Sequence, residues 1–128
     1  TTTGAAKAIA KVIPDLENKF DGFSLRVPTS TVSIVDFVAE VEDDVTVQDV
    51  NSSLRLASEE GPMVGILGFS SEPLVSSDYR GDSRSSIIDG QSTMVMGGNM
   101  VKVLTWYDNE WGYACRPADL AHMVSGSL

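Results

Sequence analysis

Apolar side chains recur at helical spacing in the first part of the chain. The stretch 5–16 carries four of them on one stripe: Ile9, Val12, Ile13 and Leu16. Thr3 stands where the N-terminal cap of such a helix would lie. Pro14 is expected to bend or end the last turn, because proline has no backbone N–H to donate. The pattern predicts a helix at the start of the chain.

Two later helices carry their own boundary signals. Thr46 and Asp49 form a relative of the capping box, ahead of an apolar stripe that stops before Gly61. A terminal helix is expected over 111–124, where Pro117 is tolerable only near the first turn. These signals predict one helix in the middle of the chain and one at its end.

Alternating apolar and polar side chains predict strands in the remaining segments. A half-buried strand over 23–27 carries Arg26 on its polar face, and a long strand over 31–42 has one apolar and one acidic face. Further strand-like runs cover 64–69, 74–79, 92–96 and 100–107, the last two joined by a Gly-rich hairpin loop. This order predicts a single α+β domain over 1–128, with a largely antiparallel or mixed sheet covered on one face by helices.

Composition limits the classes of partner and cofactor. With 9 basic and 18 acidic residues, the formal charge is -9, and no net basic field favours nucleic acid or an anionic membrane surface. The apolar runs are too short to span a membrane. The single cysteine, Cys115, excludes an internal disulfide, and together with the single histidine, His122, it leaves no zinc-finger ligand set. A reducing compartment fits this composition best.

One candidate for anion binding combines the start of the first helix with the strand over 23–27. Unpaired N–H groups and a partial positive charge gather at a helix N-terminus, Gly4 lets an anion approach the backbone, and the hydroxyl of Thr3 adds a donor. Arg26 can offer a planar fork to the same anion. The alternative is an ordinary threonine cap beside a surface arginine.

A second candidate is the aromatic string 106–113, which holds both tryptophans and two of the three tyrosines. The amide of Asn109 can form a pair of hydrogen bonds with a carboxamide such as that of nicotinamide, and Tyr113 can pack beside the nicotinamide ring. The alternatives are a strand end that closes the core and an asparagine that caps the terminal helix. Cys115 has no histidine nearby except His122, two helical turns away, so we interpret it as a packing residue.

Four segments, in this order, resemble the C-terminal part of phosphorylating glyceraldehyde-3-phosphate dehydrogenase: Thr2-Thr3-Gly4-Ala5-Ala6-Lys7-Ala8, Leu25-Arg26-Val27-Pro28-Thr29, Val75-Ser76-Ser77-Asp78 and Trp106-Tyr107-Asp108-Asn109-Glu110-Trp111-Gly112-Tyr113. The resemblance covers nearly the whole chain, and the aromatic string is its most specific part. It implies NAD(P)-dependent oxidation of a small phosphorylated aldehyde through a cysteine thiolate and a histidine base, followed by attack of inorganic phosphate on the thioester.

The same resemblance assigns roles to five residues. It implies that Thr3 and Gly4 hold a phosphate group, that Arg26 is the phosphate-binding arginine, that Asn109 holds the nicotinamide carboxamide, and that Tyr113 lies beside that ring. The family's catalytic cysteine, histidine and dinucleotide-binding domain precede these motifs, so this span is expected to hold no catalytic residue and to be inactive alone. Alternatives are a fragment of erythrose-4-phosphate dehydrogenase, which shares the motifs, and a non-catalytic binding or assembly module.

Cellular context and assembly also follow from the resemblance. The resemblance implies a cytoplasmic enzyme of glycolysis that uses NAD or NADP. The segment 94–97, leading into 101–103, resembles the photosynthetic branch of the family, so the alternative is an enzyme of the Calvin cycle in the plastid stroma. Subunits of the family pair through the sheet, and Val32, Ile34 and Val38 are expected on its open face. We expect a homo-oligomer through the strand 31–41, because like charges would repel at the acidic turn 42–44.

Overall fold

The protein is described by a computed structural model over residues 4–126, without the side chains of residues 5–7 and 10. Its helices are α1 (Gly4–Val12), α2 (Val47–Glu59) and α3 (Trp111–Ser125), with short 3-10 helices η1 (Pro14–Leu16), η2 (Gly61–Met63) and η3 (Ser76–Tyr79). The sheet contains β1 (Ser33–Glu40), β2 (Leu67–Ser70), β3 (Ser86–Met96) and β4 (Met100–Tyr107), in the order β1-β4-β3-β2. The pairs β1–β4 and β3–β4 are antiparallel and β2–β3 is parallel, so the predicted α+β class with a mixed sheet is confirmed.

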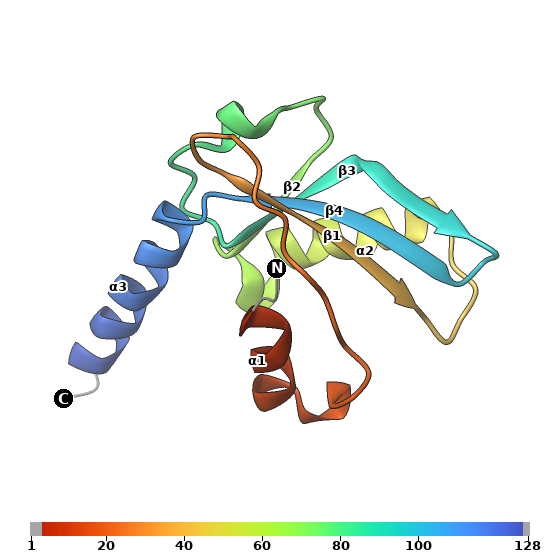
Figure 1. The fold of residues 1–128 in the computed structure, drawn as a ribbon, viewed down its shortest axis with the longest axis horizontal. Helices are drawn as coiled ribbons and strands as arrows, with labels where there is room; N and C mark the ends of the chain where they lie inside the picture. The colour runs from red at the N-terminus through yellow and green to blue at the C-terminus, as the bar shows by residue number, and fades with distance from the viewer. Residues whose placement is uncertain (1–3, 127–128) are drawn as a thin grey trace.

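Helix α2 covers one face of the sheet, whereas α1 and α3 extend away from it (Figure 1). The capping box predicted at its start is present: Thr46 Oγ1 accepts from the Asp49 N–H at 3.2 Å, and Asp49 Oδ2 accepts from the Thr46 N–H at 2.9 Å. Under the helix, Ile88, Val101 and Val103 form a buried cluster against half-buried side chains from α2 and the sheet. Burial of this apolar area is what holds α2 on the strands.

A second buried cluster lies where β1 and β4 meet the segment before β3. Val32, Tyr79 and Ile87 form it, and the Tyr79 ring stacks on that of Trp106 with centroids 5.6 Å apart. Val32 is 7% exposed and has a φ of +71°, a conformation that β-branched residues rarely adopt. Such strain persists only where neighbouring packing imposes it, and here the buried cluster does so.

Several predicted elements differ from the observed ones. The segment 23–27 is not a strand: its apolar side chains are exposed, and no strand of the described chain pairs along it. The run 74–79 is mostly η3, whose turn is favoured by the Val75 N–H donating to Asp78 Oδ2 at 2.8 Å. The first helix, expected within 5–16, ends at Val12, and Pro14 begins η1, so Pro14 does end the helix as expected. In the run 74–79 the hydrogen bond between the Val75 backbone and the Asp78 side chain thus overrides the apolar pattern.

Two further expectations are corrected at Pro117 and Val32. Pro117 lies in the interior of α3, not near its first turn; the exposed helix tolerates the lost N–H there because water reaches the backbone. Val32 precedes β1 and is buried in the second cluster, so it adds no exposed apolar side chain to the open face of the sheet. The strand expected over 92–96 is the end of a longer strand, β3, which pairs with β4 in an antiparallel hairpin.

The strain at Val32 predicts an unusual order of stability. Val32→Gly is expected to unfold at higher urea than Val32→Ala, with a difference of about 1 kcal/mol, because only glycine adopts this φ without a steric cost. At Val38, in the middle of β1, the order should be the ordinary one, with the alanine variant the more stable. An alanine variant equal to or more stable than the glycine variant at position 32 would contradict the assignment of strain.

Candidate functional site

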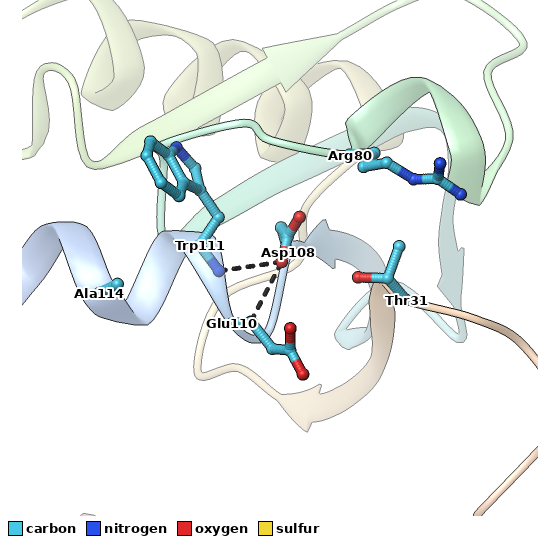
Figure 2. Close-up of a pocket in the computed structure, with 6 residues that line it drawn as sticks. All are labelled: Thr31, Arg80, Asp108, Glu110, Trp111 and Ala114. Atoms are coloured by element: carbon cyan, nitrogen blue, oxygen red, sulfur yellow. Dashed lines mark hydrogen bonds between the residues drawn. The ribbon is translucent and has the colours of Figure 1, made fainter.

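The junction between β4 and α3 is organised by a buried carboxylate. Asp108 is 4% exposed, and its Oδ1 accepts from the backbone N–H groups of Glu110 at 3.1 Å and Trp111 at 3.0 Å, as Figure 2 shows. Its Oδ2 accepts from the Gly81 N–H at 2.9 Å. One side chain therefore joins the end of β4, the first turn of α3 and the loop that follows η3.

These contacts stabilise the ionised form of Asp108. The N–H of Gly81 and then that of Trp111 hold the pKa of the carboxyl below its ordinary value, with a further contribution from the charge of Arg80, although burial opposes the shift. The start of α3 also lies close to the loop 82–85. A Cβ at Gly112 would come within 2.9 Å of the Arg84 carbonyl oxygen, so the residue must be glycine for the helix to approach this closely.

An open pocket of about 480 Å³ lies beside this junction. Its lining combines charged, polar and aromatic side chains: Thr31, Arg80, Asp108, Glu110, Trp111 and Ala114. Arg80 Nη2 donates to Ser30 Oγ at 3.4 Å, which connects the loop after η3 with the segment before β1. Glu110 points away from Arg80 in Figure 2, so the two charges are presented separately.

Asn109 lies at this junction with its side chain exposed. Its Oδ1 accepts from Ser33 Oγ at 3.3 Å, and no described residue accepts from its Nδ2. The alternative that Asn109 caps α3 is wrong, because Asp108 accepts the N–H groups at that helix start. The amide donors of Asn109 are therefore available to a ligand.

The aromatic string divides between core and surface. Trp106 is half-buried and stacks on Tyr79, as the core interpretation requires. Trp111 lines the pocket, and Tyr113, in the first turn of α3, is 73% exposed. Neither Asn109 nor Tyr113 lines the pocket itself.

The proposed anion site is only partly described. Thr3 lies outside the described residues, Gly4 begins α1 and is exposed, and Arg26 is exposed in the irregular segment before β1. The described hydrogen bonds do not connect Gly4 or Arg26 with Asn109. A role for Thr3, Gly4 and Arg26 in binding phosphate stays a prediction.

The lone thiol and imidazole take no part in the junction. Cys115 is a half-buried free thiol within α3, and His122 lies in the last turns of that helix. Across residues 4–126, no three His, Cys, Asp or Glu side chains converge as a metal site would require. No helix in the described part of the chain is long and apolar enough to cross a membrane.

Sequence reasoning did not identify Asp108, Ser33 or Arg80. An aspartate just ahead of a predicted helix start is a recognised capping signal, so the role of Asp108 at the start of α3 could have been predicted from the sequence. Ser33 and Arg80 had no local signal. Their partners, Asn109 and Ser30, lie 76 and 50 residues away in the chain.

Comparison with known proteins identifies the family. The family model described as "Glyceraldehyde 3-phosphate dehydrogenase, C-terminal domain" matches residues 1–109. A glyceraldehyde-3-phosphate dehydrogenase of Priestia megaterium (strain DSM 319 / IMG 1521) is 58% identical over 98% of the chain, and one of Geobacillus stearothermophilus is 57% identical over the same share. Glyceraldehyde-3-phosphate dehydrogenase 2 of Trichormus variabilis (strain ATCC 29413 / PCC 7937) is 56% identical over 98% of the chain.

The chain spans 37% of the length of each of these relatives. The family model matches most of the chain, and the relatives are well above 30% identical to it. The chain belongs to the glyceraldehyde 3-phosphate dehydrogenase C-terminal domain family.

The lowered pKa of Asp108 predicts a pH-dependent contribution to stability. Asp108→Asn removes one charged acceptor and is expected to cost ~1.5–3 kcal/mol at neutral pH. Because the folded pKa is lowered, this contribution is fully present above the ordinary value of 3.8 and is lost as pH falls through the folded pKa. Urea unfolding of both proteins from pH 7 to pH 2.5 should therefore show the stability gap closing at acid pH.

The matched control is Asp43→Asn, at an exposed carboxylate with no described hydrogen bond. It should leave stability within about 0.5 kcal/mol of the parent at neutral pH. A gap for Asp108→Asn that stays constant down to pH 2.5 would mean that the carboxylate charge is not what stabilises the junction.

Proposed function

We propose that residues 1–128 form the C-terminal portion of the catalytic domain of a phosphorylating glyceraldehyde-3-phosphate dehydrogenase. The reaction is oxidation of a phosphorylated aldehyde to an acyl phosphate, with NAD or NADP as hydride acceptor and inorganic phosphate as second substrate. The observation that carries the proposal is the 58% identity to a dehydrogenase of that name over nearly the whole chain. In this proposal the dinucleotide-binding domain and the catalytic cysteine and histidine lie outside residues 1–128.

The residues of this span supply binding and orientation. Thr3, Gly4 and Arg26 hold a phosphate group of the aldehyde or the attacking phosphate. Asn109 holds the nicotinamide carboxamide, and Tyr113 lies beside the ring; when bound, the nicotinamide accepts the hydride. The fit is supported by the free Nδ2 donors of Asn109 and the exposed ring of Tyr113 at the same helix start. Asp108 keeps this helix start fixed to β4.

The names of the relatives favour glyceraldehyde 3-phosphate over erythrose 4-phosphate as the aldehyde. They do not separate the two metabolic settings, because the Priestia and cyanobacterial relatives are 58% and 56% identical. We assign the protein to the cytoplasm and glycolysis, with plastid stroma and the Calvin cycle as the alternative. Whether the protein uses NAD or NADP depends on which of these two pathways it serves.

Arg26 tests this function in the full-length protein. Arg26→Ala is expected to lower kcat/KM for inorganic phosphate about 10- to 150-fold, the loss that corresponds to a charge-assisted hydrogen bond of ~1.5–3 kcal/mol. Lys11→Ala, which removes an exposed cation at the end of α1, should change it less than about twofold. Residues 1–128 alone should not oxidise the aldehyde, because covalent catalysis needs a nucleophile and a base.

Two results would contradict the proposal. One is a full-length protein that does not reduce NAD or NADP with glyceraldehyde 3-phosphate and phosphate. The other is turnover by residues 1–128 alone that Cys115→Ser abolishes.

We also propose that the protein forms a homo-oligomer through the open face of the sheet, opposite α2. Ile34 and Val38 of β1 are 45% and 55% exposed, and the strand register puts Leu104 and Met100 of β4 on the same face. The only charged pair described on this face is Lys102 with Asp36, joined at 2.9 Å, so its charge is neutralised locally. The register also puts Glu40 on this face, beside Met100, so the apolar area that favours association is the part formed by Ile34, Val38 and Leu104.

Ile34→Asp should break this association. Sedimentation at micromolar concentration is expected to give a dimer or larger species for the parent and a shift toward monomer for Ile34→Asp, because a charge would be buried unpaired. Leu56→Asp places the same change on α2, on the opposite side of the sheet, and should leave the assembly intact. A parent that is monomeric throughout this range would refute the proposed interface.

A further inference from the structure

Two Asp-Gly dipeptides occur in the chain, and the structure holds them differently. Asp21-Gly22 lies in the irregular segment between η1 and β1, whereas Asp89-Gly90 lies within β3. An aspartate that precedes glycine is chemically labile, because glycine has no Cβ to keep its backbone nitrogen away from the preceding carboxyl group. The reaction between the two groups also needs a backbone that is free to turn, so the fold decides which dipeptide reacts.

The geometry at Asp21 favours this reaction. The Gly22 N–H donates to Asp21 Oδ1 at 2.8 Å, so the nitrogen already lies against the carboxyl group that it would attack. Both residues are exposed, as is the whole stretch 21–30, and water therefore reaches the dipeptide. No described helix or strand includes the two residues, so little structure must be broken for the backbone to turn.

The fold holds Asp89-Gly90 in place by contrast. Asp89 Oδ1 accepts from the Gln91 N–H at 3.2 Å, and the Gly90 carbonyl oxygen accepts from Asn51 Nδ2 at 2.9 Å. Both residues of the dipeptide are half-buried, and β3 is paired with β2 on one side and β4 on the other. Ring closure at this dipeptide would require the centre of the sheet to open first.

We propose that Asp21 is a site of spontaneous isoaspartate formation and that the fold protects Asp89 from the same reaction. The Gly22 nitrogen attacks Asp21 Cγ and loses its proton, and a water molecule leaves the carboxyl group, which gives a cyclic imide. Water then adds to the main-chain carbonyl carbon of Asp21, and the bond from that carbon to the Gly22 nitrogen breaks. One water leaves and one enters, so the atoms of the protein are unchanged in number.

The product differs from the parent in the path of its main chain. The chain now runs through Cβ and Cγ of residue 21, and the former main-chain carbonyl is a free carboxylate. This group is the substrate of isoaspartyl carboxyl methyltransferases, which methylate it with S-adenosylmethionine, so the modified segment would recruit a repair enzyme of that class. The modification does not depend on the proposed dehydrogenase activity.

The test follows both dipeptides in the full-length protein as it ages at neutral pH. Methyl groups transferred by an isoaspartyl methyltransferase give the amount of product, and peptide mapping with electron-transfer fragmentation gives its position. Isoaspartate is expected to form at Asp21 at least about tenfold faster than at Asp89, because the strand must open before Asp89 can react. In guanidinium the two rates should agree within about threefold, since the local sequence alone then decides them.

Two variants at exposed positions check the chemistry. Asp21→Glu should leave no product at position 21, because its carboxyl group is one carbon too far away to form the same ring. Gly22→Ala should slow the reaction about fivefold or more, because its Cβ crowds the attacking nitrogen.

Two outcomes would overturn the inference. Equal rates at Asp21 and Asp89 in the folded protein would show that the fold protects neither dipeptide. Product at Asp21 in guanidinium but not in the folded protein would show that the full-length protein holds this dipeptide as firmly as the sheet holds the other.

Discussion

The carboxylate of Asp108 is the constraint on which the site depends. The loop after η3 donates the Gly81 N–H to it, and the start of α3 donates the N–H groups of Glu110 and Trp111, so two segments of the chain are joined at one buried carboxylate. An ionised acceptor suits this position because hydrogen bonds to a charged group are stronger than neutral ones. The loop after η3, the exposed Asn109 and the first turn of α3 are consequently fixed relative to the sheet.

The two faces of the sheet are packed differently. Helix α2 covers β2 and β3 on one face with an apolar cluster and with polar contacts, in which Asn51 donates from Nδ2 to the Gly90 carbonyl at 2.9 Å and accepts from Thr93 Oγ1 at 2.7 Å. Among the described residues, packing on the other face lies toward the site, where Tyr79 and Trp106 stack. Packing on this face thus supports the site end of β1 and leaves the rest of the face open.

The parts of the fold that local chemistry determines were predictable. Thr46 and Asp49 identified the start of α2, and the glycines after Met96 identified the β3–β4 turn, because these signals act over a few residues. The strand expected over 23–27 failed because a strand exists only beside a partner, and no pattern within one segment states whether that partner is present. The same limit concealed the contact between Ser33 and Asn109, whereas the family motif pointed to Asn109 directly.

The pairing of β1 with β4 has a consequence for the order of folding. Ser33 pairs with Tyr107, whereas β3 and β4 are joined by a short turn, so the hairpin can form early while β1 must close a much longer loop. During synthesis from the N-terminus, β1 leaves the ribosome well before β4 exists. Until β4 follows, the apolar side chains of β1 have no partner strand, and an unpaired apolar strand favours aggregation of the nascent chain.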